Sequence, residues 1–206
     1  SKTMKIIKYK TITFLFLFFV TSIVYGNEEK SNKIEVLVNE SIITKYDIVQ
    51  RLRINSILNR FEINESNYNQ LLSNVVDDMI VEKLKIKKVE EYNINLNKDE
   101  FKNHENAFLS SINYKKEDLE NLFTINNINY DYLKNILEID LKWQKLIYGL
   151  YLRVSSVTEQ EISDLISKNP DINKEVASDL LLQRQLDLKS IKLLNDLRDE
   201  ATIEYK

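Results

Sequence analysis

The hydrophobic and polar positions along the chain follow a strand pattern at two places and a helical pattern between them. From Lys33 to Asn39, isoleucine and valine alternate with mostly polar residues, which is typical of a half-buried strand. Residues 201–205, near the end of the chain, alternate in the same way. Because a short strand is unstable alone, we expect these two to pair in a small two-stranded sheet. That pairing requires the last helix to fold back against the N-terminal helices.

Between the two strands, apolar residues recur every three or four positions, which predicts a succession of helices. The longest should cover residues 68–92, 129–147 and 171–197, the last of them starting after Asn169-Pro170. Three helix starts are marked by a capping residue followed three positions later by an acidic one: Thr44 with Asp47, Asn97 with Glu100, and Thr158 with Glu161.

Glycine and proline are scarce, with two glycines and one proline in 206 residues. Sandwiches and barrels need frequent turns of these residues, and doubly wound sheets need glycine where strands meet helices. The fold class should therefore be mainly α, a multi-helix core with one small sheet. We expect one domain, with a helical core over residues 27–168 and a closing helix and strand over 169–206 that pack back on it.

The first 26 residues have the three parts of a secretory signal, namely a basic start, an apolar run over residues 12–24 and small residues before the exit. Cleavage is expected between Gly26 and Asn27. The apolar run is shorter than the roughly 18 residues that span a bilayer, although an uncleaved inner-membrane anchor stays open as an alternative. The expected location is periplasmic, with membrane contact only through this segment.

Charge and chemistry exclude several classes of function. Cleavage after residue 26 would leave 25 Lys and Arg against 32 Asp and Glu, which is no basic footprint for nucleic acid. The chain has no cysteine, and His104 is its only histidine. The usual zinc sites, thiol nucleophiles and phosphate-binding loops need residues that are missing here. We expect no catalytic residue, no metal and no cofactor, and hence no enzyme.

The closing helix has apolar residues on more than one side, whereas a helix packed on one side needs only one stripe. One interpretation is a helix buried in the middle of the domain; the other is that part of the second stripe lines a groove for polypeptide. The first stripe comprises Ala177, Leu180, Leu181, Leu188, Ile191 and Leu194, and the second Leu182, Leu186, Leu193 and Leu197. On the groove interpretation, the candidate peptide-binding residues are Tyr148, Tyr151, Leu182, Leu186 and Leu193, since tyrosine suits polypeptide binding.

The order of these segments resembles the N-terminal chaperone domain of the periplasmic SurA family. Residues 34–47 combine a strand, an Asn-Glu turn, an Ile-Thr pair and an aspartate in the first helical turn, as that family does. Residues 79–97, 141–147, 157–162 and 182–205 are similar to its later helices and closing strand. Typical members insert one or two parvulin-type prolyl isomerase domains, whereas here only residues 163–169 lie between core and closing helix.

The resemblance implies an ATP-independent periplasmic holdase for unfolded exported proteins, with outer-membrane proteins as the expected clients. It implies no isomerase activity, since the isomerase domain is missing. Two alternatives stay open: a non-catalytic interaction or scaffold protein of the cell envelope, and an isomerase relative without the activity.

Overall fold

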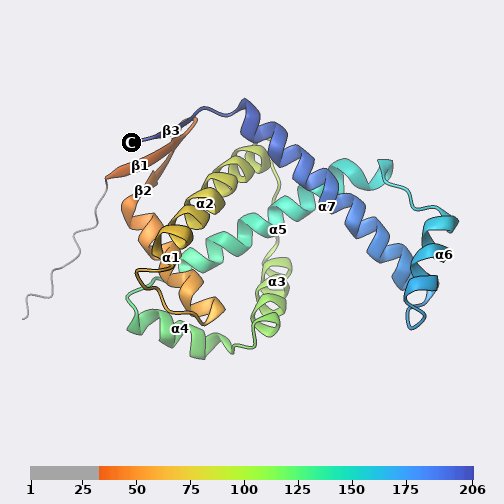
Figure 1. Cartoon of the computed structure of the whole chain (residues 1–206), viewed down its shortest axis with the longest axis horizontal. Coiled ribbons are helices and arrows are strands. Elements are labelled where there is room, and N and C mark those ends of the chain that lie inside the picture. The colour runs from red at the N-terminus through yellow and green to blue at the C-terminus, as the bar shows by residue number, and fades with distance from the viewer. Residues whose placement is uncertain (1–32) are drawn as a thin grey trace, which may run out of the picture.

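The computed structural model describes residues 33–206, so the expected signal peptide and the cleavage position at Gly26 and Asn27 lie outside the described residues. Helices dominate this part of the chain, as expected (Figure 1). The elements in order are β1 (Ile34–Val38), β2 (Ser41–Thr44), α1 (Lys45–Asn59), α2 (Tyr68–Glu91), α3 (Lys98–Ser111), α4 (Lys116–Ile125), α5 (Asp131–Tyr151), the 3-10 turn η1 (Leu152–Val154), α6 (Glu159–Lys168), α7 (Lys174–Glu200) and β3 (Ile203–Tyr205).

The predicted pairing of the first and last strands is confirmed, because β1 pairs antiparallel with β3 through Val36 opposite Tyr205 and Val38 opposite Ile203. The sheet has three strands in the order β2-β1-β3, however, and the expectation of two strands was wrong. The third arises because Asn39 adopts a left-handed conformation, with φ of 54°. Asparagine tolerates that conformation, so the chain reverses tightly and Ile43 returns opposite Val36.

All three predicted capping boxes are present, and each helix begins where its box lies. The start of α7 differs from the expectation of Asp171. The side chain of Asn173 accepts a hydrogen bond from the Val176 backbone N–H at 2.9 Å, so the helix begins at Lys174. Asparagine is a strong N-cap, and this hydrogen bond fixes the start of α7 three residues after the expected one.

Three clusters of buried side chains form the core. The first lies between the inner face of the sheet, α1 and α2, and includes Val36, Ile43 and Ile80. The second joins α1, α3, α4 and α5 around Phe123, and the third joins α2, α5 and α7 around Trp143. Within residues 33–206 no helix is both long and apolar enough to cross a membrane.

The last helix folds back on the N-terminal part. Its C-terminal end lies against α2, where Arg198 Nη2 donates to Asp77 Oδ1 at 2.7 Å and Leu197 packs on two of the clusters. Residues 33–151 and 188–206 form the body of the molecule. The N-terminal end of α7 projects beyond it and carries α6, which contacts α7 (Figure 1). We call this projection, residues 152–187, the arm.

Candidate polypeptide-binding surface

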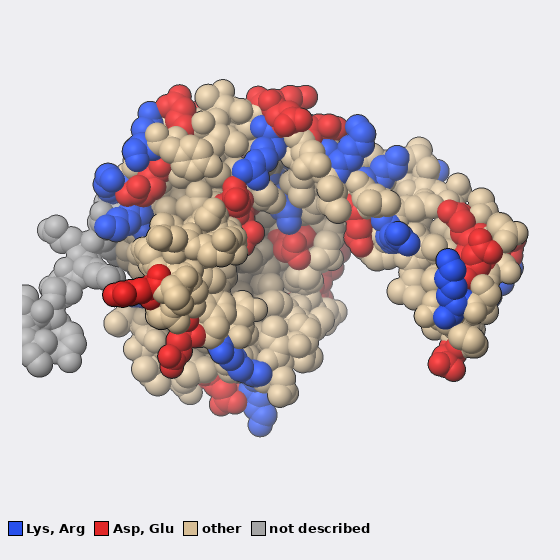
Figure 2. Space-filling view, in the orientation of Figure 1, with Lys and Arg blue, Asp and Glu red and all other residues tan. Residues whose placement is uncertain are grey.

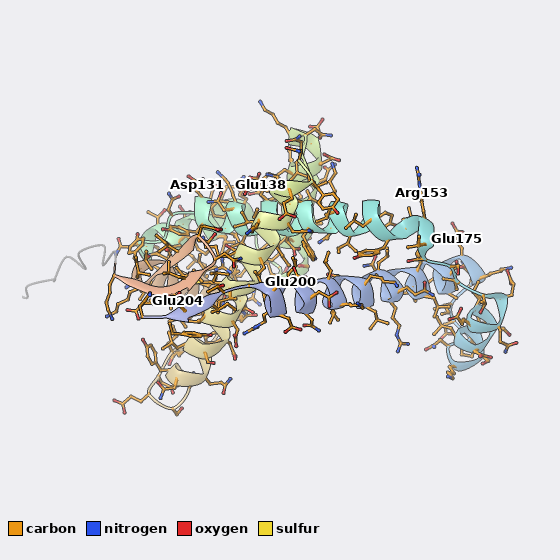
Figure 3. The ribbon with its side chains drawn as sticks, turned by 90° about the horizontal axis from the view of Figure 1, so that it is seen from above. Asp131, Glu138, Arg153, Glu175, Glu200 and Glu204 are labelled. Carbon is orange, nitrogen blue, oxygen red and sulfur yellow. The ribbon has the colours of Figure 1, made fainter. Side chains whose placement is uncertain are left out.

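The arm is held to the body by the contact between α5 and α7. Figure 3 shows α5 running from Asp131 toward Arg153 and α7 running back from Glu175 to Glu200 beside it. Trp143 is buried in this contact, and its indole Nε1–H donates to Ser190 Oγ at 2.8 Å. A hydrogen bond in a buried apolar setting fixes how the two helices lie along each other.

Leu186 lies at the centre of the same contact. Its exposed fraction is 1%, and it packs with Trp143, Leu146 and Ile147. A side chain so deeply buried has no surface with which to touch another polypeptide while the helices stay packed. Leu186 therefore serves packing in this structure, contrary to the candidate binding role given to it above.

Three other candidates, Tyr151, Leu182 and Leu193, are half-buried against that cluster. The second stripe of α7 thus faces α5, and the groove expected along it is filled by the neighbouring helix. Tyr148 is different, because its ring leaves the contact and is 48% exposed. Of the five candidates, Tyr148 and Leu182 come together at one place on the surface.

Of the four large apolar side chains exposed on α7, three belong to its first stripe. Ala177 is fully buried with α6 packed on α7, but Leu180, Leu188 and Ile191 are each more than half exposed. Val176, Leu180 and Ile191 lie on one side of the helix, since they are separated by near-whole turns. The helices α2, α5 and α6 pack against other parts of α7 and leave this side uncovered.

A hollow of about 410 Å³ lies where this exposed side meets the end of α5. It is lined by Tyr148, Val176, Asp179, Leu180, Leu182 and Gln183. The sequence analysis named Tyr148 and Leu182 as candidates but did not assign Val176, Asp179, Leu180 or Gln183 to the site. A signal for Val176 existed, because it stands one turn before Leu180 in an otherwise polar stretch.

Exposed apolar side chains gather on this part of the molecule. Of the 14 large apolar residues with exposed side chains in the described chain, seven fall between residues 148 and 191, and these are Tyr148, Leu152, Val154, Val176, Leu180, Leu188 and Ile191. Figure 2 shows the arm standing out from the body with a recess between them. A cluster of this kind marks an interaction surface more often than scattered apolar residues do.

A second hollow of about 540 Å³, lined by both charged and apolar side chains, lies between α2, α3 and α5, and His104 is on its lining. Its charged groups pair with one another: Arg51 contacts Glu82, and Lys85 Nζ lies 3.4 Å from Asp140 Oδ1. Burial raises the pKa of the Asp78 carboxyl, and the Arg51 charge partly opposes this. Within residues 33–206, no group of three or more potential ligands is placed to hold a metal ion.

A third hollow, of about 430 Å³, opens between β3 and the N-terminal half of α2. Most of its exposed lining is apolar and includes Leu72 and Val76 from α2, together with Tyr68 and Tyr205. Both tyrosines are largely exposed, at 43% and 66%. This hollow is the second place where apolar surface is open to a partner.

Comparison with solved structures gives the class of this fold. The chain is similar to a structure from work on the virulence factor PEB4 and the periplasmic protein Cj1289, two structurally related SurA-like chaperones of the human pathogen Campylobacter jejuni. This chain and that structure share 14% sequence identity, and they superpose with a TM-score of 0.51. The match covers 85% of this chain and 99% of the other. A scan against protein-family models finds no match, and neither does a search of curated protein sequences. The fold is SurA-like.

Proposed function

We propose that this chain is an ATP-independent chaperone that holds unfolded exported polypeptides, outer-membrane proteins among them, in the periplasm. The observation that carries the proposal is the exposed side of α7, where Leu180, Leu188 and Ile191 are each more than half exposed and where Leu180 shares a hollow with the exposed Tyr148. The SurA-like fold supports the same role. The protein works by binding, with no catalytic group, metal or cofactor.

The energetics favour a long, shallow contact with a flexible client. Each fully buried apolar side chain contributes roughly 1.5–3 kcal/mol, whereas association costs about 4–15 kcal/mol. Micromolar binding needs about −8 kcal/mol net. On the order of five to eight client side chains must therefore be buried together, more than the hollow beside Tyr148 holds. An unfolded segment can lie along the arm and into the recess, while a compact ligand cannot.

The test measures aggregation of a denatured outer-membrane protein diluted from urea, by light scattering, with and without the purified protein. We expect suppression at a near-stoichiometric ratio. Leu180→Glu should weaken it, because replacing an exposed leucine of the hollow by a carboxylate opposes burial of client side chains there. The matched control is Ile125→Glu, an equally polar change at an exposed isoleucine on α4, at the other end of the molecule (Figure 1).

Absence of suppression even at large excess would rule out the holding function. Equal effects of the two glutamate variants would show that the arm is not where clients bind. A non-catalytic scaffold role is the competing function. It predicts that pull-down yields one stoichiometric folded partner in place of a spread of unfolded ones. A proline-isomerisation assay should give background rates, since the parvulin-type domain of typical relatives has no counterpart in the sequence.

A further inference from the structure

The sheet ends at β3 in an edge whose backbone groups face outward. Asn39 N donates to Thr202 O at 2.8 Å, and Lys206 N donates to Glu35 O at 2.9 Å, so the groups of residues 202 and 206 face β1. Alternate residues of an antiparallel strand direct their backbone groups to opposite sides. Those of Ile203 and Tyr205 therefore point away from the sheet, and no bond on that side is made from within residues 33–206.

The open edge borders the apolar hollow between β3 and α2. Tyr205 and Lys206 line that hollow from the strand, and Tyr68, Leu72 and Val76 line it from α2. The opposite edge, β2, contributes no residue to it. A row of free backbone donors and acceptors beside apolar pockets is the arrangement by which sheets capture an extended peptide as an added strand.

We propose that β3 accepts an extended client segment as a fourth strand, whose alternate apolar side chains enter the hollow between β3 and α2. This inference rests on the proposed holding function and names the form of client that it takes. Only an extended main chain can pair with the outward groups of Ile203 and Tyr205. Because side chains of a strand alternate, the segment must be apolar on one face and polar on the other, as the roughly ten-residue strands of outer-membrane barrels are.

The charged side chains at the rim of this hollow favour one sign of charge in the added segment. Three of the four charged side chains there are already in ion pairs, since Glu35 contacts Lys33, Asp77 contacts Arg198 and Lys206 contacts Glu204. The Lys45 ammonium, also on the rim, pairs with no carboxylate within residues 33–206. A segment with an acidic residue next to its apolar ones therefore fits better than a basic one. Only Ile203 and Tyr205 present outward backbone N–H and C=O groups. Because so few hydrogen bonds can form, we expect the strand to bind its client reversibly.

The test measures binding of a labelled, end-capped peptide of about nine residues that alternates valine or tyrosine with threonine and glutamate, by fluorescence anisotropy. Tyr205→Pro removes the outward N–H and fills the edge with its ring. It leaves the bonds to β1 intact, because proline suits an edge position whose N–H faces outward. Tyr205→Thr removes the same aromatic ring but keeps the N–H, and is the matched variant.

We expect Tyr205→Pro to weaken peptide binding about tenfold or more, and Tyr205→Thr to weaken it no more than about threefold. N-methylation of the central peptide residues, which keeps every side chain, should abolish binding to the unchanged protein. Circular dichroism and thermal melting establish that both variants stay folded. Equal losses in the two variants, or unchanged binding of the N-methylated peptide, would overturn strand addition in favour of side-chain contacts alone.

Failure of this inference and of the holding function can be told apart. If the protein suppresses aggregation but Tyr205→Pro binds the peptide as the unchanged protein does, the strand-addition site is wrong and the holding function stands. If the peptide binds with the expected pattern but aggregation is not suppressed, β3 is a strand-capture site without a holding role. A concentration-dependent dimer that Tyr205→Pro abolishes would show that the occupant is a second copy of this chain, which overturns the client assignment.

Discussion

The two sides of α7 have the same kind of residues but different neighbours. Leu182, Leu186 and Leu193 face α5 and are half or fully buried, whereas Leu180 and Leu188 face away and are more than half exposed. Leucine on both sides means that hydrophobicity cannot separate packing from binding here. The separation comes from α2, α5 and α6, which pack against α7 and leave the side that carries Leu180 uncovered.

The largest expected effect sharpens this contrast directly. Leu186→Ala should lower the free energy of unfolding by about 2–5 kcal/mol, because it opens a cavity between Trp143, Leu146 and Ile147. Leu188→Ala, two positions along the same helix, should change it by no more than about 0.5 kcal/mol. Urea unfolding followed by circular dichroism measures both. Similar losses for the two variants would mean that the outward side is also packed in solution.

The second effect concerns the hydrogen bond that joins the two helices. Trp143→Phe removes the indole donor to Ser190 and part of a buried ring, so we expect a loss of about 1–3 kcal/mol. Ser190→Ala removes only the acceptor and should cost about 0.5–1.5 kcal/mol. In the double variant the two losses should be less than additive, since both remove one bond. Full additivity would show that the bond does not form.

Short-range sequence signals predicted helix starts well. How elements pack against one another was harder to predict from the sequence. The capping boxes at Thr44, Asn97 and Thr158 were readable because their hydrogen bonds form within four residues. The meeting of β1 and β3 was also predicted, since neither strand is stable alone. The strand β2 was missed, because it depends on the left-handed turn at Asn39, and asparagine permits that conformation without requiring it.

The exposed apolar surface on α7 was predicted only in part, and its binding role stays a prediction. Tyr148 and Leu182 were named and lie at the hollow on the arm, but Leu186 was named and is buried. Which stripe of α7 is covered depends on the rotation of the helix against α5, set by contacts such as Trp143 with Ser190, 47 positions apart in the chain. No spacing rule within one helix contains that information.

The third prediction compares the body with the arm through two helix N-caps of the same type. Thr44 caps α1 in the body and Thr158 caps α6 on the arm, each through a capping box. Thr44→Ala should lower the global free energy of unfolding by about 1 kcal/mol. Thr158→Ala should lower it by about 0.3 kcal/mol or less and instead speed hydrogen exchange in α6, because that helix packs mainly on α7 and opens on its own. A full-sized global loss for Thr158→Ala would make arm and body one cooperative unit.

The smallest effect tests Asp78, a partly desolvated carboxyl on the lining of the hollow between α2, α3 and α5. Burial raises the folded-state pKa of Asp78 above its ordinary value of 3.8, so the folded state binds the proton more tightly than the unfolded state. The folded state is therefore favoured most below pH 3.8, and this contribution is lost as the pH rises through the folded-state pKa. Asp78→Asn has a similar shape and does not titrate. It should match the unchanged protein in acid and exceed it in stability at neutral pH, as urea midpoints across that range would measure. A variant less stable at neutral pH would show that the attraction between Asp78 and Arg51 outweighs the cost of burying the carboxylate.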